Sequence, residues 1–247
     1  MFVFLGRNVF ARNPTIVAKI GFPVYSLPMD RIDSQRLPSL PSKDILWLIV
    51  GSVFALLLAI YWVSLQNDFV RLDDGLLIYE NPAVRQFSFT SLKTIFTTYD
   101  PELYIPLTLF FYQILYAISG TNAFIYHAFS LLIHSANVLG VLWFTYLLTQ
   151  RKSAALVAGF IFAVHPLNVE AVSWAAALKD QLSTFFFLAA FIAFLRWREY
   201  QPTRYAWWSL LFFFLGLLSK VMILTLPVLI LLLEDLSSAQ GFPYTSL

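Results

Sequence analysis

The sequence contains no cysteine among its 247 residues, which excludes disulfide bonds and thiolate chemistry. Charged residues are also scarce: Asp, Glu, Lys and Arg make up 12% of the chain, against about 25% in soluble globular proteins. The net charge of +2 is too small to indicate a nucleic-acid partner. The scarcity of charged residues indicates a lipid environment.

Apolar and aromatic residues are abundant instead. Hydrophobic residues make up 59% of the chain, the mean hydropathy is +0.72, and the chain holds 25 Phe, 12 Tyr and 7 Trp. Aromatic side chains of this kind are typical of the interfaces of a membrane. We therefore predict an all-α, multi-pass membrane protein with membrane lipids around it.

Apolar segments define the predicted organisation, since about 20 apolar residues cross ~30 Å of hydrocarbon. Residues 1–43 form a basic, cytoplasmic tail, residues 44–236 a membrane domain, and residues 237–247 the C-terminal end. An outer loop at 65–122 carries a predicted interfacial helix at 103–118. The predicted spans are 45–64, 123–149, 153–171, 181–197, 205–219 and 221–236.

The basic residues predict the orientation. If the helix at 103–118 does not cross the membrane, three basic segments lie on the same side of it: the tail, Arg151-Lys152 and the loop from Arg196 to Arg204. They hold eleven of the sixteen Lys and Arg residues, so the positive-inside rule makes that side cytoplasmic. The opposite, extracytoplasmic face then collects eight of the fourteen acids. Dividing the last apolar stretch at Lys220 places this lysine at that interface rather than in mid-membrane.

A polar row interrupts the predicted span at 123–149. His127, Ser130, His134 and Asn137 recur at steps of three, four and three, so they share one helix face. In lipid such a face must meet other helices or a cavity. Either interhelical hydrogen bonds or a transporter's substrate pathway would explain it.

Two adjacent carboxylates, Asp73 and Asp74, follow the first predicted span. A carboxylate at this boundary can serve as a general base, while the cations of the same face hold a phosphate. The pair can equally cap a short helix or mark the water boundary. The residues require no cofactor and define no metal site, although the loop carboxylates could supply ligands to a divalent metal.

An ordered set of motifs identifies a family resemblance. The motifs are Phe69-Val-Arg-Leu-Asp-Asp, Glu80-Asn-Pro, Tyr104-Ile-Pro-Leu-Thr108, Tyr126-His127, Phe162-Ala-Val-His-Pro-Leu-Asn-Val-Glu-Ala-Val172, Lys179-Asp-Gln-Leu-Ser183 and Leu218-Ser-Lys220. This order, from about Asn67 to Asp235, resembles the membrane half of the transmembrane and tetratricopeptide-repeat O-mannosyltransferases and their bacterial relatives. These proteins belong to the GT-C glycosyltransferases.

The resemblance implies a GT-C-like helical bundle and an inverting transfer of a mannose-like sugar. The donor would be a polyprenyl-phosphate-linked sugar, and the acceptor a hydroxyl of a protein Ser or Thr, or of a glycan or lipid. The active face would be extracytoplasmic in a bacterial plasma membrane, or lumenal in an endoplasmic reticulum. By the same resemblance the catalytic residues would be Asp73 and Asp74, with Asp73 favoured as the base.

Further roles follow from the same resemblance. Donor phosphate or sugar binding maps to Arg71, Tyr104, Pro106, Lys179 and Lys220. Positions near the acceptor, or behind the catalytic pair, map to His165, Glu170 and Asp180.

The chain also departs from many of these relatives. Ile105, Leu178 and Val221 stand where charged residues are common, which affects the sugar and the acceptor more than the reaction class. The predicted spans are fewer than GT-C enzymes usually have, and no 34-residue repeat is visible. We therefore expect a truncated chain. The alternatives are a flippase or transporter of lipid-linked sugars and an inactive membrane scaffold.

Overall fold

The computed structural model describes residues 43–98, 103–200 and 202–239, and within these ranges the chain forms helices and no β-strand. The predicted all-α class is confirmed. Of the predicted tail at 1–43, only Lys43 is described, and residues 240–247 of the predicted C-terminal end lie outside the described residues.

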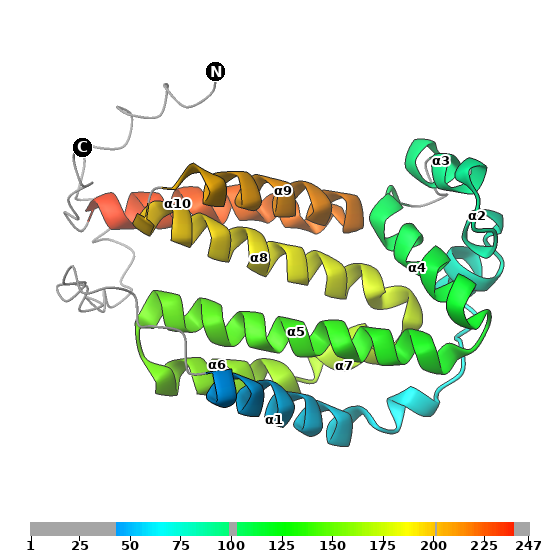
Figure 1. The fold of residues 1–247 in the computed structure, drawn as a ribbon, viewed down its shortest axis with the longest axis horizontal. Helices are drawn as coiled ribbons and strands as arrows, with labels where there is room; N and C mark the ends of the chain where they lie inside the picture. Colours follow the sequence, from blue (N-terminus) through cyan, green and yellow to red (C-terminus); the bar gives the residue numbers. More distant parts are fainter. Residues whose placement is uncertain (1–42, 99–102, 201, 240–247) are drawn as a thin grey trace, which may run out of the picture. The chain divides into compact units, whose positions relative to one another are not determined.

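Helices that run side by side form the bundle, and the helices between residues 75 and 119 lie at one of its ends (Figure 1). The bundle helices are α1 (Lys43–Tyr61), α5 (Ala123–Thr149), α6 (Lys152–Val164), α8 (Leu178–Tyr200), α9 (Thr203–Ser219) and α10 (Thr225–Ala239). The others are η3 (Ser64–Gln66), η4 (Gly75–Tyr79), α2 (Pro82–Arg85), α3 (Phe89–Thr97), α4 (Pro106–Ser119), α7 (Leu167–Ser173), η5 (Ala175–Ala177) and η6 (Val221–Leu224).

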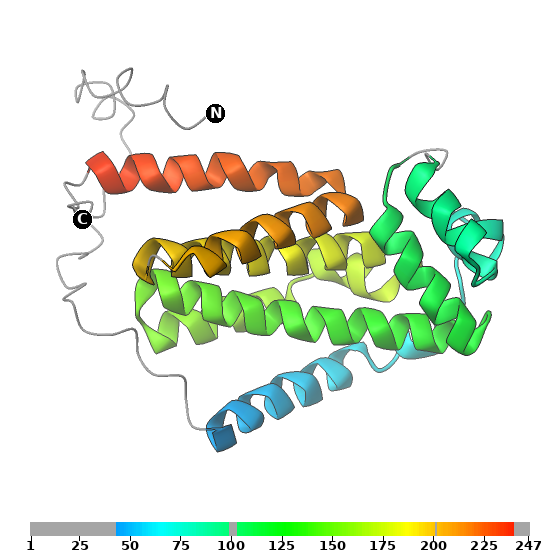
Figure 2. The same ribbon diagram turned by 45° about the horizontal axis from the view of Figure 1, so that its top comes forward.

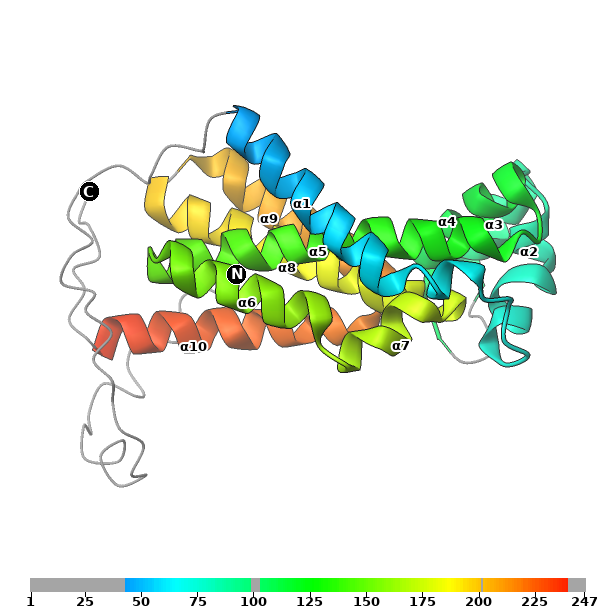
Figure 3. The same ribbon diagram turned by 90° about the horizontal axis from the view of Figure 1, so that it is seen from below.

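Helix α8 is the centre of the packing. It lies between α5 and α9 in Figure 1, and both helices pack along it. Helix α6 packs against the other side of α5, and α1 also contacts α5. Figures 2 and 3 show α1 and α10 on opposite flanks of this bundle. The start of α8 and the end of α9 therefore meet at the end of the bundle where α4 lies.

Two described helical segments are long and apolar enough to cross a membrane: α5, and residues 175–200, which combine η5 and α8. The apolar parts of the predicted spans at 45–64, 205–219 and 221–236 fall on shorter helices, so their crossing stays a prediction.

The predicted span at 153–171 is not one straight helix. Helix α6 ends at Val164, and α7 starts at Leu167 after a bend of 60°. The cause is Pro166, which has no backbone N–H to continue the helical ladder. The pair amounts to a further crossing only if the bent helices are taken together as one broken span.

Local capping explains the elements of the outer loop. The side chain of Asn81 accepts a hydrogen bond from Ala83 N at 3.0 Å, and Pro82 occupies the first turn of α2. Ser88 caps α3 through Ser91 N at 3.1 Å. The helix predicted at 103–118 is α4, which starts later because Pro106 opens its first turn.

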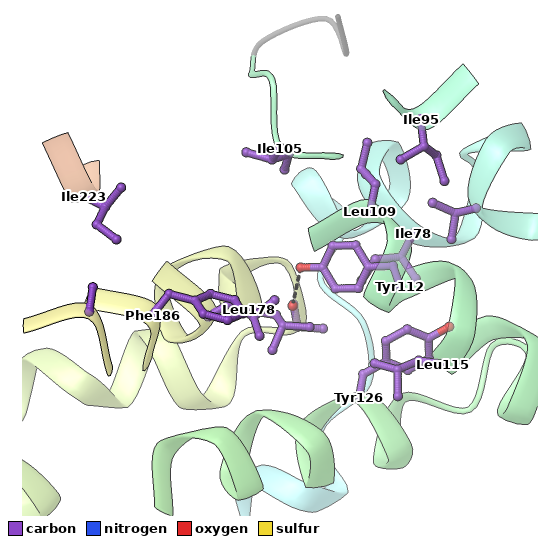
Figure 4. Close-up of a cluster of buried hydrophobic side chains, with 14 of the residues drawn as sticks. Ile78, Ile95, Ile105, Leu109, Tyr112, Leu115, Tyr126, Leu178, Phe186 and Ile223 are labelled. Carbon is purple, nitrogen blue, oxygen red and sulfur yellow. Dashed lines mark hydrogen bonds between the residues drawn. The ribbon is translucent and has the colours of Figure 1, made fainter. Parts of the chain in front are cut away.

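The larger apolar core joins this loop to the bundle (Figure 4). Ile78 of η4 and Ile105 before α4 share one cluster with Leu178 and Phe186 of α8 and with Ile223 of η6. Burial of such side chains contributes about 1.5–3 kcal/mol each, which fixes the loop against the start of α8.

The polar row on α5 is buried, as its spacing predicts: His127, Ser130, His134 and Asn137 are at most 2% exposed. Asn137 Nδ2 donates to the backbone oxygen of Gln181 at 3.0 Å and to its side-chain oxygen at 2.9 Å. The row therefore faces other helices of the bundle.

Candidate active site

The two adjacent aspartates have opposite environments. Asp74 is fully buried, whereas the side chain of Asp73 is 33% exposed. Both carboxylate oxygens of Asp74 accept hydrogen bonds from backbone amides: Val70 N at 2.8 Å and Ala176 N at 2.7 Å. Asp74 therefore ties the loop to η5, 102 residues further along the chain.

Burial raises the pKa of Asp74 above its ordinary value, and the negative charge of Asp73 acts in the same direction. The hydrogen bonds from Val70 and Ala176 lower the pKa and oppose that effect. Because both oxygens are engaged and no surface is accessible, Asp74 is placed to hold backbone rather than to meet a substrate.

Asp74 is also the N-cap residue of a π-helical turn, η4. Such turns are rare and occur often at functional sites. Gly75 begins this turn and is buried, and a Cβ atom there would lie 3.3 Å from Glu80 and from the hydroxyl of Tyr79. The small residue after Asp74 lets the turn close tightly.

Asp73 forms an ion pair with α8. Lys179 Nζ donates to Asp73 Oδ2 at 3.2 Å, and the lysine side chain is only 10% exposed. The ammonium also lies 5.8 Å from the centre of the Trp174 ring, a distance at which cation–π attraction operates. Within the described part of the chain, Asp73 Oδ1 accepts no hydrogen bond, so this oxygen is available.

A second ion pair lies beside the first. Lys220 Nζ donates to Asp180 Oδ1, and both side chains are partly exposed, at 23% and 39%. Lys220 ends α9, at the break that the sequence predicts. Thr108 of α4 supports this end of α9 by donating to the backbone oxygen of Ser219 at 3.1 Å.

Lys179 and Asp180 are consecutive residues at the start of α8, so both ion pairs attach to this end of the helix. We refer to Asp73, Lys179, Asp180 and Lys220 as the charge cluster; no described contact joins one pair to the other. The cluster joins the outer loop, the start of α8 and the end of α9. Four of the residues singled out in the sequence are thus brought together.

The remaining predicted residues lie outside this charge cluster. Arg71 is exposed, and Tyr104 donates from its hydroxyl to the backbone oxygen of Phe96 at 3.0 Å. Pro106 is buried in the first turn of α4. No described contact links these three residues to the ion pairs.

His165 and Glu170 are both exposed. His165 Nδ1 accepts a hydrogen bond from Leu167 N at 3.2 Å, so it helps to turn the chain between α6 and α7. Glu170 lies in the first turn of α7, with no described contact to the charge cluster.

Trp174 and Tyr112 were missed by sequence reasoning. The indole Nε1 of Trp174 is buried without a hydrogen-bond partner in the described chain, and its ring neighbours Lys179. Tyr112 donates to Ala175 O at 2.9 Å, as Figure 4 shows, and so anchors η5 to α4. No spacing in the sequence signals either contact. Among the described residues, no three His, Asp or Glu side chains converge as metal ligands.

The fold and the charge cluster define an all-helical membrane protein with a polar site at one end of its bundle. The family model described as dolichyl-phosphate-mannose-protein mannosyltransferase matches residues 96–242, more than half of the chain, and the chain belongs to this family. This membership confirms the GT-C resemblance and supports a glycosyltransferase kind of function. Comparisons with curated proteins and with solved structures returned no match.

The matched range includes Lys179, Asp180 and Lys220 but starts after Asp73 and Asp74. Roles for the two aspartates therefore rest on their geometry.

Proposed function

We propose that the chain transfers a mannose-like sugar from a polyprenyl-phosphate donor to an acceptor hydroxyl, with Asp73 as the general base. The acceptor is a protein Ser or Thr, or a hydroxyl of a glycan or lipid, on the extracytoplasmic or lumenal face. One observation carries the proposal: the Asp73 side chain is 33% exposed and, among the described residues, uses only Oδ2, on Lys179 of the helix start that also carries a second ion pair.

The chemistry fits the charge cluster. The acceptor oxygen attacks the anomeric carbon with inversion, its proton passes to Asp73, and the bond from carbon to phosphate oxygen breaks. The leaving polyprenyl phosphate gains negative charge, which nearby cations stabilise. Lys179 and Lys220 each carry three N–H donors and use one on a carboxylate, so two remain on each for a phosphate.

In this proposal Asp74 is a positioning residue. Its hydrogen bonds to Val70 and Ala176 fix the loop against η5, which leads directly into α8. The fixed loop holds Asp73 opposite Lys179. Such support matters because a catalytic group must be held within about 0.5 Å of its productive position.

Two of the three uncharged positions that depart from relatives are core positions. Ile105 and Leu178 are each 1% exposed, whereas Val221 is 53% exposed. A charge at either buried position would have to leave the apolar core or be neutralised. We propose that the loss of these charges changes which sugar and acceptor are bound, while the base and the lysines remain.

The test uses membranes that contain the full chain, a polyprenyl-phosphate mannose donor and a Ser/Thr-rich peptide. Asp73→Asn should lower transfer by roughly 10²–10⁴-fold, the usual contribution of a general base, while membrane insertion and donor binding stay normal. Asp68→Asn is the matched control, because Asp68 is an exposed acid of the same loop. Full transfer by Asp73→Asn, or no transfer by the unmodified chain, would contradict the proposal.

We propose no cofactor for this reaction. Loss of transfer in EDTA, restored by a divalent cation, would instead assign a metal to the loop carboxylates.

The same membranes also distinguish the transporter alternative from the transferase. A flippase would move the lipid-linked sugar across the bilayer through His127 and His134, independently of Asp73. The packing does not favour that pathway, because His134 is fully buried between the rings of Tyr61 and Phe162, at centroid distances of 5.6 and 5.5 Å.

A further inference from the structure

A large apolar groove lies at a distance from the charge cluster, between α5, α8 and α9. Its volume is about 470 Å³, within the usual range of ligand sites. Along α8 the groove extends from Phe185 to Arg196, roughly 16 Å at 1.5 Å per residue. Apart from Arg196 and the inner Asn137, apolar and aromatic side chains dominate its lining.

Arg196 is the cation of this groove, and aromatic rings hold it in place. Its guanidinium lies 5.5 Å from the ring centre of Trp143 and 5.9 Å from that of Tyr200. No carboxylate forms an ion pair with Arg196 among the described residues, although Glu199, one turn further along α8, lies close enough to interact with its charge. The guanidinium N–H donors therefore remain free for an external anion.

The surroundings of Arg196 match a membrane interface. Trp143 and Trp208, both lining residues, are 41% and 49% exposed, as interfacial aromatics are. Further cations lie at neighbouring helix ends: Arg151 follows α5, Lys152 begins α6, and Arg204 lies in the first turn of α9. This is the end of the bundle that the sequence predicts to be cytoplasmic.

We propose that this groove binds one acyl chain of an anionic glycerophospholipid, whose phosphate is held by Arg196. The positive charge of Arg196 selects an anionic headgroup, and the lipid's acyl chain lies in the apolar groove and extends toward Asn137. Arg196 lies 16 residues beyond Asp180 on one helix, about 24 Å away, so this lipid site is separate from the charge cluster. The inference does not depend on the proposed transfer reaction.

The experiment measures quenching of tryptophan fluorescence by brominated lipids in nanodiscs that contain the full chain. At equal mole fraction, brominated phosphatidylglycerol should quench more strongly than brominated phosphatidylcholine, because Trp143 and Trp208 line the groove. Arg196→Gln should weaken the preference for phosphatidylglycerol about fivefold, the effect of one cation near a lipid surface. Arg204→Gln is the matched control, since Arg204 rests on the Tyr205 ring and does not line the groove.

A second variant tests the groove itself. Ala189→Phe would fill it without adding a tryptophan and should abolish the preference, while the helical content stays normal. Equal quenching by the two lipids would mean annular lipid only and would overturn the proposal, as would an unchanged preference in Arg196→Gln. If Ala189→Phe alters the oligomeric state but not the lipid preference, a second copy of the chain occupies the groove and the proposal fails.

Discussion

The two ends of the helical bundle use their cations differently. At one end, Lys179 and Lys220 are paired with Asp73 and Asp180. At the other, Arg196 and Arg204 lie over aromatic rings. Figure 1 shows that α8 runs from the first end to the second, so one helix carries both arrangements.

This difference bears on function. A carboxylate partner fixes the position of a cation and also brings a base close to it, which suits chemistry between a hydroxyl and a phosphate. An aromatic partner fixes the position of a cation but leaves its N–H donors unused, which suits binding of an external anion. The carboxylate-paired end therefore fits catalysis, and the ring-held end fits lipid recognition.

The largest effect on stability is expected from Asp74→Asn at the carboxylate-paired end. The amide has one acceptor oxygen, so either Val70 N or Ala176 N loses its buried partner and faces an NH₂ group. We expect the free energy of unfolding to fall by about 2–4 kcal/mol, because hydrogen bonds to charged groups are strong and orphaned donors are costly. Unfolding of the full chain in mixed detergent micelles would measure it.

Asp73→Asn is the control for that change. Asp73 is partly exposed and the amide oxygen can still accept from Lys179, so this variant should cost less than Asp74→Asn. Equal losses of unfolding free energy in the two variants would contradict the assignment of Asp74 as the positioning residue and Asp73 as the base.

A second test changes the packing beside Lys220. In Gly216→Ala the new methyl group would collide with Ile223 of η6 and lie 3.2 Å from Phe186 Cβ. Overpacking of this kind costs about 1–3 kcal/mol, and here it displaces η6, which directly follows Lys220. We expect a similar loss of stability from Gly159→Ala, whose methyl group would meet Leu142 Cγ at 2.5 Å.

The two glycine variants should differ in transfer activity. Gly216→Ala should lower it by disturbing the pair of Lys220 and Asp180, whereas Gly159→Ala, between α5 and α6, should leave the rate of the folded protein unchanged. Gly51→Ala serves as a reference, because nothing lies within 4 Å of its added methyl group. Equal activity losses in Gly216→Ala and Gly159→Ala would argue against a special role for the end of α9.

The sequence predicted features that depend on local spacing. The buried row on α5 follows from the 3.6-residue period, and the break at Lys220 follows from the cost of a lysine in lipid. The different environments of Asp73 and Asp74 could not be predicted, because the burial of Asp74 depends on Ala176 N, 102 residues away. The helix end at His165-Pro166 also follows from the sequence, because proline has no N–H to continue the helix. The 60° angle between α6 and α7 does not, because it depends on how the two helices pack.

The smallest effect is expected for Arg198 and Glu234, an ion pair at the ring-held end. Their side chains are 32% and 34% exposed, and Arg198 Nε lies 3.5 Å from Glu234 Oε1. Water screens such a pair, so a double-mutant cycle with Arg198→Gln and Glu234→Gln should give a coupling of about 0–1 kcal/mol, and less in high salt. A coupling well above 1 kcal/mol would show that carboxylate pairing also organises this end. The contrast between the two ends would then rest on Arg196 and Arg204 alone.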